Sequence, residues 1–291
     1  MTHKGIGLFV GIDVSQDKLA VALADAGAQG DALYPGVFEN TPVGVEKRLK
    51  KLSGYGGVSA CYEAGPTGYG LYRQIHAHGF ECCVVAPSLI PSRADGRVKT
   101  DRLDAMRLAR LLRAGELAPI WVPDVTHEAM RDLVRTRERA AEDHRHKRQL
   151  ITAFLLRHGQ SCPRTRAWTM RYLRWLQTLS FGHPAHQIAL QEMLQAERHA
   201  NERLERLTRH IEARVPEWDL APAVNALQAL RGVALISAVT FMAEVGEGRR
   251  FEIPLRLMAY LGLVPSEYST GKSTRRGGIP RAGNARVHHM Y

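Results

Sequence analysis

The sequence predicts an α/β domain with a mixed β-sheet, followed by long charged helices and a mainly helical C-terminal region. Three short β-rich runs open the chain: GLFVGIDVS from Gly7, KLAVALADA from Lys18 and GVFEN from Gly36. Helix-like and strand-like stretches then alternate up to Pro123, after which the sequence becomes highly charged and helical. Strands first, and then alternating helices and strands, are typical of a mixed sheet covered by helices.

The first 123 residues supply the elements of this sheet. Short polar gaps separate the three opening runs, which predicts an antiparallel meander. A helix over 41–52, a strand from Val58, a helix over 67–78 and a buried strand from Glu81 follow. Residues 89–99 carry Pro, Gly and basic residues without periodicity, so we expect a mobile connection that meets a phosphate backbone through Arg97 and Lys99.

The middle of the chain, residues 124–220, is predicted to form helices over about 126–158 and 184–214, with a shorter Trp- and Arg-rich helix near 166–179. A narrow apolar seam on the last of these helices is typical of a coiled coil, and it fits the preceding helix and a second copy of the chain equally well. The arginines of the first long helix, including Arg135 and Arg148, are interpreted as a solvated face that favours nucleic-acid contact. The seam residues are Met193, Ala196, Ala200, Leu204, Leu207 and Ile211.

Residues 221–291 begin with two apolar helices around Arg231 and Gly232 and end in a tail rich in Gly, Ser and Arg. The composition of the tail suits a loop whose backbone amides and guanidinium groups approach phosphates. A flexible basic tail would have the same composition.

The overall composition favours a globular protein with an anionic partner. Forty Lys and Arg against 29 Asp and Glu give a formal net charge of +11, which ranks nucleic acid ahead of an acidic membrane. No apolar run approaches the length of about 18 residues that spans a membrane, and the N-terminus lacks a cleavage pattern, so we expect a cytoplasmic protein without a membrane segment. The four cysteines show neither zinc nor disulfide-framework spacing and are expected in the core.

A pair of carboxylates opens a predicted helix at residues 99–112, KTDRLDAMRLARLL. Asp101 and Asp104 are three residues apart, so both would lie on one face of the first helical turn, where the macrodipole favours anions. Such a pair can hold a cation. Alternatively, Asp101 or Thr100 caps the helix and Asp104 pairs with an arginine.

Two further acids, Asp13 and Glu63, end predicted strands within hydrophobic runs, where a carboxylate is costly without a partner or a metal. If these strands are neighbours and the Asp101 helix packs across them, four carboxylates converge. Four hard oxygen donors suit one or two Mg²⁺ ions, or Mn²⁺ in their place, and such ions assist phosphoryl transfer.

These motifs resemble a known family. GIDVS around Asp13, YEAGPTGYG around Glu63 and KTDRLDA around Asp101 are similar to the RuvC-like DEDD domain of insertion-sequence transposases of the 110/1111 type, which are related to the Piv DNA invertases. LRGVALISAVTFMAEVG, RFEIPLRLMAYLGLVPSEYSTG and RRGGIPRAGN resemble the C-terminal transposase domain of that family. The resemblance implies an RNase H-like domain over 1–123, a coiled-coil region over 124–220 and a transposase domain over 221–291.

The resemblance also implies a mechanism of DNA strand cleavage and exchange. Metal held by the four acids would help to bind the scissile phosphate while a serine attacks it. The family's serine lies in a short loop after a G-L-x-P turn; that loop corresponds here to residues 265–271, which gives the role to Ser269, with Thr270 and Ser273 as neighbouring alternatives. Basic residues beside this loop would make it electropositive and contact nucleic acid. They are Lys272, Arg275, Arg276 and Arg281.

The partners implied by the resemblance are double-stranded DNA and a structured noncoding guide RNA that pairs with target and donor DNA. If base pairing with the guide RNA selects the DNA sequence, the protein needs to recognise only the sugar-phosphate backbone and the shape of the nucleic acid. The positive charge of the chain agrees with binding of this kind. The resemblance further implies a homodimer or a dimer of dimers around two DNA duplexes.

Three other interpretations are distinguishable. A sugar-kinase or actin-like ATPase would share GIDVS, but a second phosphate loop is missing from the sequence. A RuvC-like junction resolvase would need the four acids but not Ser269. A non-catalytic nucleic-acid-binding remnant would need neither; it is suggested because related proteins continue with further helix beyond the position of Tyr291.

Overall fold

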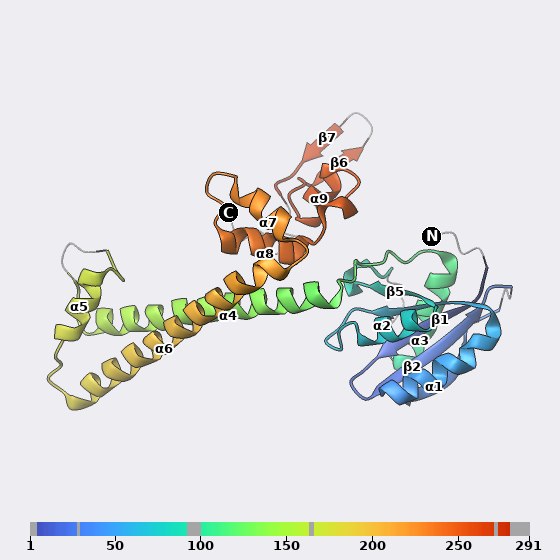
Figure 1. Ribbon diagram of the computed structural model, residues 1–291, viewed down its shortest axis with the longest axis horizontal. Coiled ribbons are helices and arrows are strands. Elements are labelled where there is room, and N and C mark those ends of the chain that lie inside the picture. Colours follow the sequence, from blue (N-terminus) through green and yellow to red (C-terminus); the bar gives the residue numbers. More distant parts are fainter. Residues whose placement is uncertain (1–4, 28–29, 92–99, 163–165, 271–272, 280–291) are drawn as a thin grey trace. The chain divides into compact units, whose positions relative to one another are not determined.

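The chain folds into two compact units, Met1–Val122 and Pro123–Tyr291 (Figure 1). The structure is a computed structural model, and it describes residues 5–27, 30–91, 100–162, 166–270 and 273–279. Within the second unit, the predicted boundary between a coiled-coil region and a transposase domain stays a prediction. No helix in the described ranges combines the length and the apolar character needed to cross a membrane.

The first unit is built on a five-stranded sheet in the order β3-β2-β1-β4-β5. The first three strands pair antiparallel, which confirms the predicted meander, and β1, β4 and β5 pair parallel. The sheet is therefore mixed, as expected of an RNase H-like core. The strands are β1 (Ile6–Val14), β2 (Lys18–Asp25), β3 (Leu33–Glu39), β4 (Gly57–Glu63) and β5 (Glu81–Val85).

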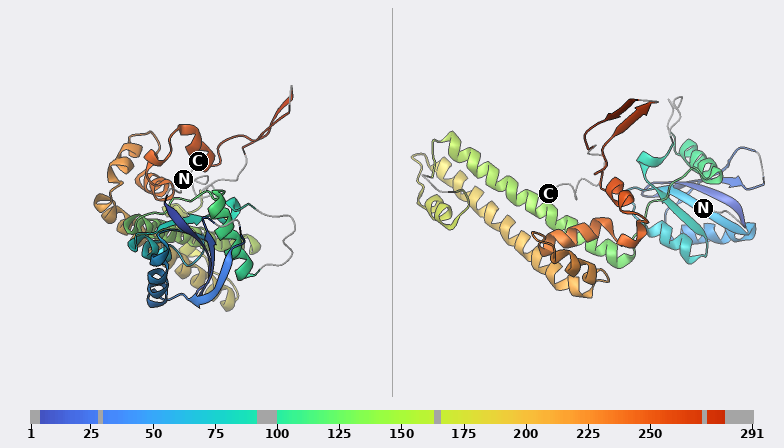
Figure 2. Two further views of the ribbon diagram at one scale, coloured as in Figure 1. Left: turned by 90° about the vertical axis from the view of Figure 1, so that its right-hand side faces the viewer. Right: turned by 90° about the horizontal axis from the view of Figure 1, so that it is seen from above.

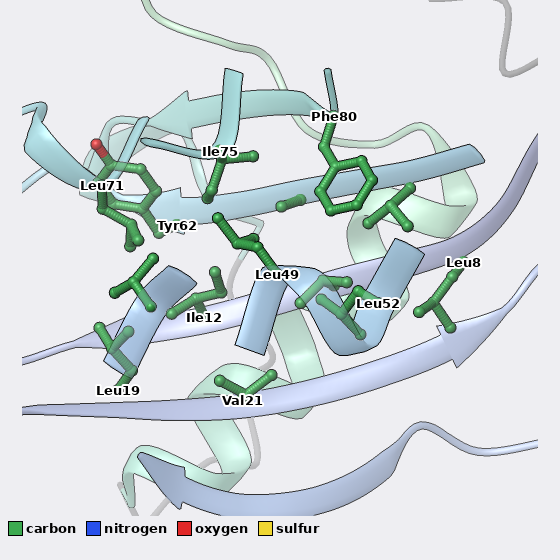
Figure 3. Packing of buried hydrophobic residues seen from close by; sticks show 14 of the residues in the cluster. Leu8, Ile12, Leu19, Val21, Leu49, Leu52, Tyr62, Leu71, Ile75 and Phe80 are labelled. Carbon is green, nitrogen blue, oxygen red and sulfur yellow. The ribbon is translucent and has the colours of Figure 1, made fainter. Parts of the chain in front are cut away.

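Helices cover both faces of this sheet. Alternate residues of β1 point to opposite faces, so Leu8, Val10 and Ile12 join one hydrophobic cluster and Phe9 joins another. Residues of α1 (Pro42–Leu52) and α2 (Gly70–Ala77) complete the first cluster, which is shown in Figure 3. Residues of α3 (Asp101–Ala114) complete the second. Short 3₁₀ turns at Ser53–Tyr55 and Pro87–Leu89 end α1 and follow β5.

The second unit contains a long antiparallel helical hairpin of α4 (Val125–Arg157) and α6 (Pro184–Arg214), with α5 (Met170–Thr178) at its far end (Figures 1 and 2). Buried Ile211 of α6 lies in one cluster with Val134 of α4, and Leu190 lies in another with Ile151. The seam of α6 therefore packs on the preceding helix of the same chain.

Buried ion pairs correct the interpretation of Arg135 and Arg148 as part of a solvated face, whereas Arg139 and Arg145 of α4 are exposed as predicted. Arg148 donates from Nε to Oε1 of Glu197 on α6 at 2.8 Å, and His144 forms a 2.8 Å hydrogen bond to the same oxygen. Arg135 forms a two-pronged pair with Glu244, whose side chain is only 2% exposed. Buried carboxylates require such partners, which is why these arginines turn inward.

The C-terminal part packs on the other end of the hairpin. Its two predicted apolar helices are α7 (Ala221–Gln228) and α8 (Leu235–Val245), joined through Gly232, whose φ of 90° favours glycine. A 3₁₀ turn at Val215–Glu217 precedes α7 and another at Gly248–Arg250 precedes α9 (Pro254–Tyr260). A two-stranded sheet of β6 (Glu267–Thr270) and β7 (Ser273–Arg276) follows. The predicted fold class, α/β plus α, is confirmed.

Candidate active site

The fold brings two of the predicted acids to the same edge of the first sheet. Asp13 is the penultimate residue of β1 and Glu63 is the last residue of β4. These strands are parallel neighbours whose register aligns Ile12 with Tyr62, so the next residue of each strand is the acid. Both acids therefore lie at the carboxyl ends of adjacent strands, which the sequence alone could not establish.

Both acids also belong to the face of the sheet that α3 covers. Gly11 is paired with Cys61, and the Sγ of Cys61 donates to the carbonyl oxygen of Leu108 of α3 at 3.5 Å. Side chains two residues apart in a strand share a face, so Asp13 and Glu63 lie on the same side as Cys61. Both side chains are half-buried.

Helix α3 begins at this same edge. It runs opposite to β1: Ala105 and Ala109 lie over Gly11, and Arg113 near the helix end hydrogen-bonds the carbonyl oxygen of Asp25 at 3.3 Å. Asp25 is paired with Leu8 near the start of β1. The first turn of α3 therefore lies towards the end of β1 that carries Asp13.

Thr100, and not Asp101, caps α3. Its hydroxyl accepts from the backbone N–H of Leu103 at 3.3 Å, and the helix dipole then favours the two acids in its first turn. Asp101 is exposed and Asp104 is half-buried. Among the described residues neither side chain forms a hydrogen bond or an ion pair, so the alternative of an Asp104–arginine pair finds no support there.

Four carboxylates are thus arranged around one end of β1, β4 and α3. In the described part of the chain, however, no three His, Cys, Asp or Glu side chains stand close enough together to hold a metal ion. The donors are of the right chemical type for Mg²⁺ or Mn²⁺, and the strand and helix positions place them at one edge. The side chains are not gathered into a formed ligand set.

Gly11 is a site residue that the sequence interpretation missed. A Cβ at this position would come within 3.0 Å of the carbonyl oxygen of Ala105 and of the backbone of Ala109. Only glycine therefore allows α3 to approach β1 as closely as it does. A glycine inside a strand, two residues before an acid, was the available signal.

Ser269 lies in a strand of a β-hairpin and not in the expected Ser/Gly loop. It occupies the third position of β6, where its partner across the hairpin is Thr274. The pairing of the hairpin continues one residue beyond β6, because the backbone N–H of Gly277 donates to the carbonyl oxygen of Ser266 at 2.7 Å. Ser269 is exposed.

The hairpin register separates the candidate nucleophiles. Thr270 is paired with Ser273, and paired residues share a face, so these two lie on the opposite face from Ser269. Arg275 lies two residues after Ser273 and belongs to that same opposite face. The expectation that Arg275 lies beside Ser269 is therefore not met, because the two residues belong to opposite faces of the hairpin. The backbone of Arg276 ends β7, while Arg97, Lys99, Lys272 and Arg281 lie outside the described residues.

Comparisons with known proteins agree with these observations. A DEDD transposase family model of IS110 type matches residues 10–159, and a model described as "Transposase IS116/IS110/IS902 family" matches residues 224–290. The chain belongs to the IS110 family of transposases. The four acids fall in the range of the first model and Ser269 in the range of the second. Transposases are DNA-processing enzymes, which gives this IS110-family chain its activity class.

Similar sequences support the assignment to the IS110 family. The y4qE protein of Sinorhizobium fredii (strain NBRC 101917 / NGR234), named as a transposase, is 56% identical over 280 residues, which cover 96% of this chain and 68% of that protein. "Transposase for insertion sequence element IS1533" of Leptospira borgpetersenii is 30% identical over 243 residues, 82% of this chain and 70% of that protein. The "Thermus thermophilus RuvC structure" aligns with 12% identity and a TM-score of 0.28, over 39% of this chain and 99% of that one.

Proposed function

We propose that this IS110-family protein cleaves and exchanges DNA strands with the help of a divalent metal at the edge formed by Asp13, Glu63, Asp101 and Asp104. The observation that carries the proposal is the common placement of the acids. Two adjacent parallel strands each carry an acid on one face at their carboxyl end, and the helix that covers this face has two more acids in its first turn. Grouped carboxylates repel one another, and this cost is tolerable where a cation offsets it.

Asp13, Glu63 and Asp104 would hold the metal, with exposed Asp101 as a further donor. Carboxylate oxygens suit Mg²⁺ and Mn²⁺, and the half-buried side chains can change rotamer around fixed backbone positions. When bound, the metal would offset the negative charge of the scissile phosphate. The positive end of the α3 dipole acts in the same sense as the metal, because it too attracts the negative charge of the two acids in the first turn.

Ser269 is the proposed nucleophile. Its hydroxyl oxygen would form a bond to phosphorus as one bridging P–O bond of the DNA breaks, while the serine proton passes to a base and the departing sugar oxygen takes up a proton. One phosphoester replaces another, so the reaction needs no oxidant or nucleotide cofactor. The exposed position on a short hairpin supports access to a DNA backbone.

The role of the acids is tested by metal-dependent cleavage of DNA that carries the element's junctions. We expect Asp13→Asn and Asp104→Asn to abolish cleavage in Mg²⁺ and in Mn²⁺ while the proteins stay folded by circular dichroism. Asp17→Asn is the matched control, because Asp17 is an exposed acid in the turn after β1 and should be dispensable. Cleavage by the Asp13→Asn and Asp104→Asn proteins at the wild-type rate would refute the proposal.

The nucleophile is tested by trapping a covalent protein–DNA adduct. Ser269→Ala should eliminate the adduct, whereas Ser273→Ala and Thr270→Val, on the other face of the hairpin, should retain it. An adduct that disappears only with Ser273→Ala would move the role to that face, where Arg275 also lies. A junction resolvase would use the four acids alone, and its cleavage would survive Ser269→Ala without any adduct.

We also propose that a noncoding guide RNA and double-stranded DNA are the partners, and that the active form is a homodimer or a dimer of dimers. The net charge of +11 supports a polyanionic partner. Expression with the native flanking DNA, followed by sequencing of the RNA that copurifies, should yield one structured transcript from the flank. Sedimentation with and without that RNA would give the oligomeric state.

A further inference from the structure

The far end of the helical hairpin carries no acidic residue. From His144 to Gln191 the sequence contains no Asp or Glu. The same stretch contains eight Lys and Arg residues: Arg145, Lys147, Arg148, Arg157, Arg164, Arg166, Arg171 and Arg174. We call this stretch, which comprises the second half of α4, α5 and the start of α6, the hairpin tip. The C-terminal stretch after Glu267 is also basic and free of acidic residues, whereas most of the remaining chain mixes both signs of charge.

The fold gathers the acid-free stretch in space. Because α4 and α6 run antiparallel, Ile151 of α4 and Leu190 of α6 lie in one hydrophobic cluster with Leu176 of α5 (Figure 1). The described charges of the tip therefore belong to one end of the hairpin and are not spread along it. Like charges so placed repel one another, and an anionic partner would relieve this repulsion.

Most of the described charges of the tip form no ion pair with a described residue. Lys147 pairs with Asp143 and Arg148 pairs with Glu197, so these two are committed. The other described arginines of the tip are exposed and form no ion pair with a described residue: Arg145, Arg157, Arg166, Arg171 and Arg174. Arg171 and Arg174 are three residues apart on α5 and therefore share one face of that helix.

Aromatic rings accompany the arginines. Tyr172 is buried, and its ring centroid lies 5.6 Å from that of Trp168 and 5.3 Å from that of Trp175. Both tryptophans are only half-buried, although they pack against the core of the tip. A surface that combines partly exposed rings with guanidinium groups outside ion pairs is suited to stacking bases and contacting phosphates.

Trp168 is held in a strained backbone conformation. Its φ of 64° is rare for a bulky residue, and the guanidinium carbon of Arg148 lies 4.6 Å from its ring centroid. Arg148 is itself fixed by Glu197. Strain of this kind persists only where the surroundings enforce it, and it often accompanies binding surfaces.

We infer that the hairpin tip is a binding site for a nucleic-acid strand with unpaired bases, in which Arg171 and Arg174 contact phosphates and Trp175 stacks on a base. The inference deepens the proposed function, since it rests on a chain that handles nucleic acid. It assigns a site that is separate from the four acids and from Ser269. It predicts a preference for single strands over blunt duplex, because only unpaired bases offer an open face to a ring.

The test is fluorescence anisotropy with the full chain, in chelator so that cleavage cannot occur. The probes are labelled RNA and DNA single strands of about 20 nucleotides, longer than typical single-strand site sizes, and a blunt duplex of the same sequence. The variant Arg171→Ala/Arg174→Ala removes the two phosphate contacts. The control Arg206→Ala/Arg209→Ala removes two exposed arginines with the same spacing from the mixed-charge part of α6.

We expect the tip variant to lower the slope of log affinity against log salt by up to about 1.4, roughly 0.7 for each lost contact with a single strand. The control should keep the parent slope. Trp175→Leu, which keeps an apolar side chain on the core, should weaken single-strand binding about five-fold or more and leave duplex binding unchanged. The RNA and DNA probes show which strand the tip prefers.

An unchanged slope in the tip variant would overturn the inference, as would equal losses in the tip variant and the control. A change of oligomeric state in the tip variant by sedimentation, with unaltered binding, would assign the surface to a second copy of the chain. That occupant would use the exposed apolar residues Leu156, Met170 and Ile188. A parent chain that binds none of the probes would instead refute the proposed function, so the two failures are distinguishable.

Discussion

Gly11 of β1 lies directly under Ala105 of α3, so closely that a Cβ on Gly11 would overlap the carbonyl oxygen of Ala105. Ala105 and the following contact residue Ala109 are both completely buried. Small residues on both elements allow the helix backbone to rest on the strand backbone. Since Asp13 follows Gly11 by two residues and Asp104 precedes Ala105 by one, this contact sets the distance between the two acids.

Gly11→Ala should therefore impair stability and cleavage together. The added methyl meets backbone atoms that cannot rotate away, and overpacking of this kind costs typically about 1–3 kcal/mol of unfolding free energy. Urea denaturation measures the loss, and cleavage in Mg²⁺ measures the misplacement of Asp104. Gly54→Ala is the control, because Gly54 faces open space and should change stability by less than about 0.5 kcal/mol. Equal effects of the two substitutions would contradict this account of the contact.

Local patterns in the sequence were sufficient to predict the elements of the candidate site. Alternation placed Asp13 and Glu63 at strand ends, and three-residue spacing placed Asp101 and Asp104 on one helical turn. The pairing of β1 with β4 was an assumption, because strand order depends on contacts distant in the sequence. The same limit applies to Ser269: polar β-branched neighbours suit a strand, but the Gly and Ser content of the segment favoured a loop.

Buried acids gave a signal that was used at one site and overlooked at another. The argument that a carboxylate in an apolar run needs a partner was applied to Asp13 and Glu63. It applies equally to Glu244, which lies in the apolar helix LISAVTFMAEV, whereas Glu197 has polar neighbours in the sequence and gave no such signal. Their arginine partners could not be predicted, since Arg135 and Glu244 are 109 residues apart in the chain.

Glu244→Ala should strongly destabilise the second unit. It leaves Arg135 without its two-pronged partner, and breaking a buried pair by removing one member costs about 3–5 kcal/mol. We expect the lower end of this range, because the Arg135 side chain is 35% exposed and can be partly rehydrated. Denaturant unfolding measures the change. Glu217→Ala removes an exposed partner of Arg214 and should cost less than about 1 kcal/mol; similar losses in both variants would show that burial does not control the strength of these pairs.

Glu197→Ala should loosen the middle of the α4–α6 hairpin. His144 and Arg148 both hydrogen-bond the same oxygen of Glu197. One substitution therefore leaves two polar side chains without this hydrogen-bond acceptor, and the His144 side chain is buried. The expected loss is again about 3–5 kcal/mol in urea. Glu202→Ala, at an exposed position of the same helix, should lie within about 0.5 kcal/mol of the parent protein. A small effect of Glu197→Ala would mean that water replaces the carboxylate.

His127 should make the unfolding free energy depend on pH. Burial lowers the pKa of its imidazole below the ordinary value of 6.5, as does Arg131, while the contact with the Ala243 carbonyl oxygen and the charges of Asp124 and Glu244 act in the opposite direction. Between the two pKa values the unfolded chain binds a proton that the folded chain does not. The contribution of His127 to the unfolding free energy is therefore complete above about pH 6.5 and decreases as the pH falls towards the pKa of His127 in the folded chain. The slope of the unfolding free energy is at most about 1.4 kcal/mol per pH unit. Urea unfolding of the parent and of His127→Gln gives the unfolding free energy at each pH. Plotted against pH, the two free energies should converge as the pH is lowered. His146→Gln, at an exposed position of α4, should run parallel to the parent, and a His127→Gln curve that is also parallel would exclude His127 as the source of the pH dependence.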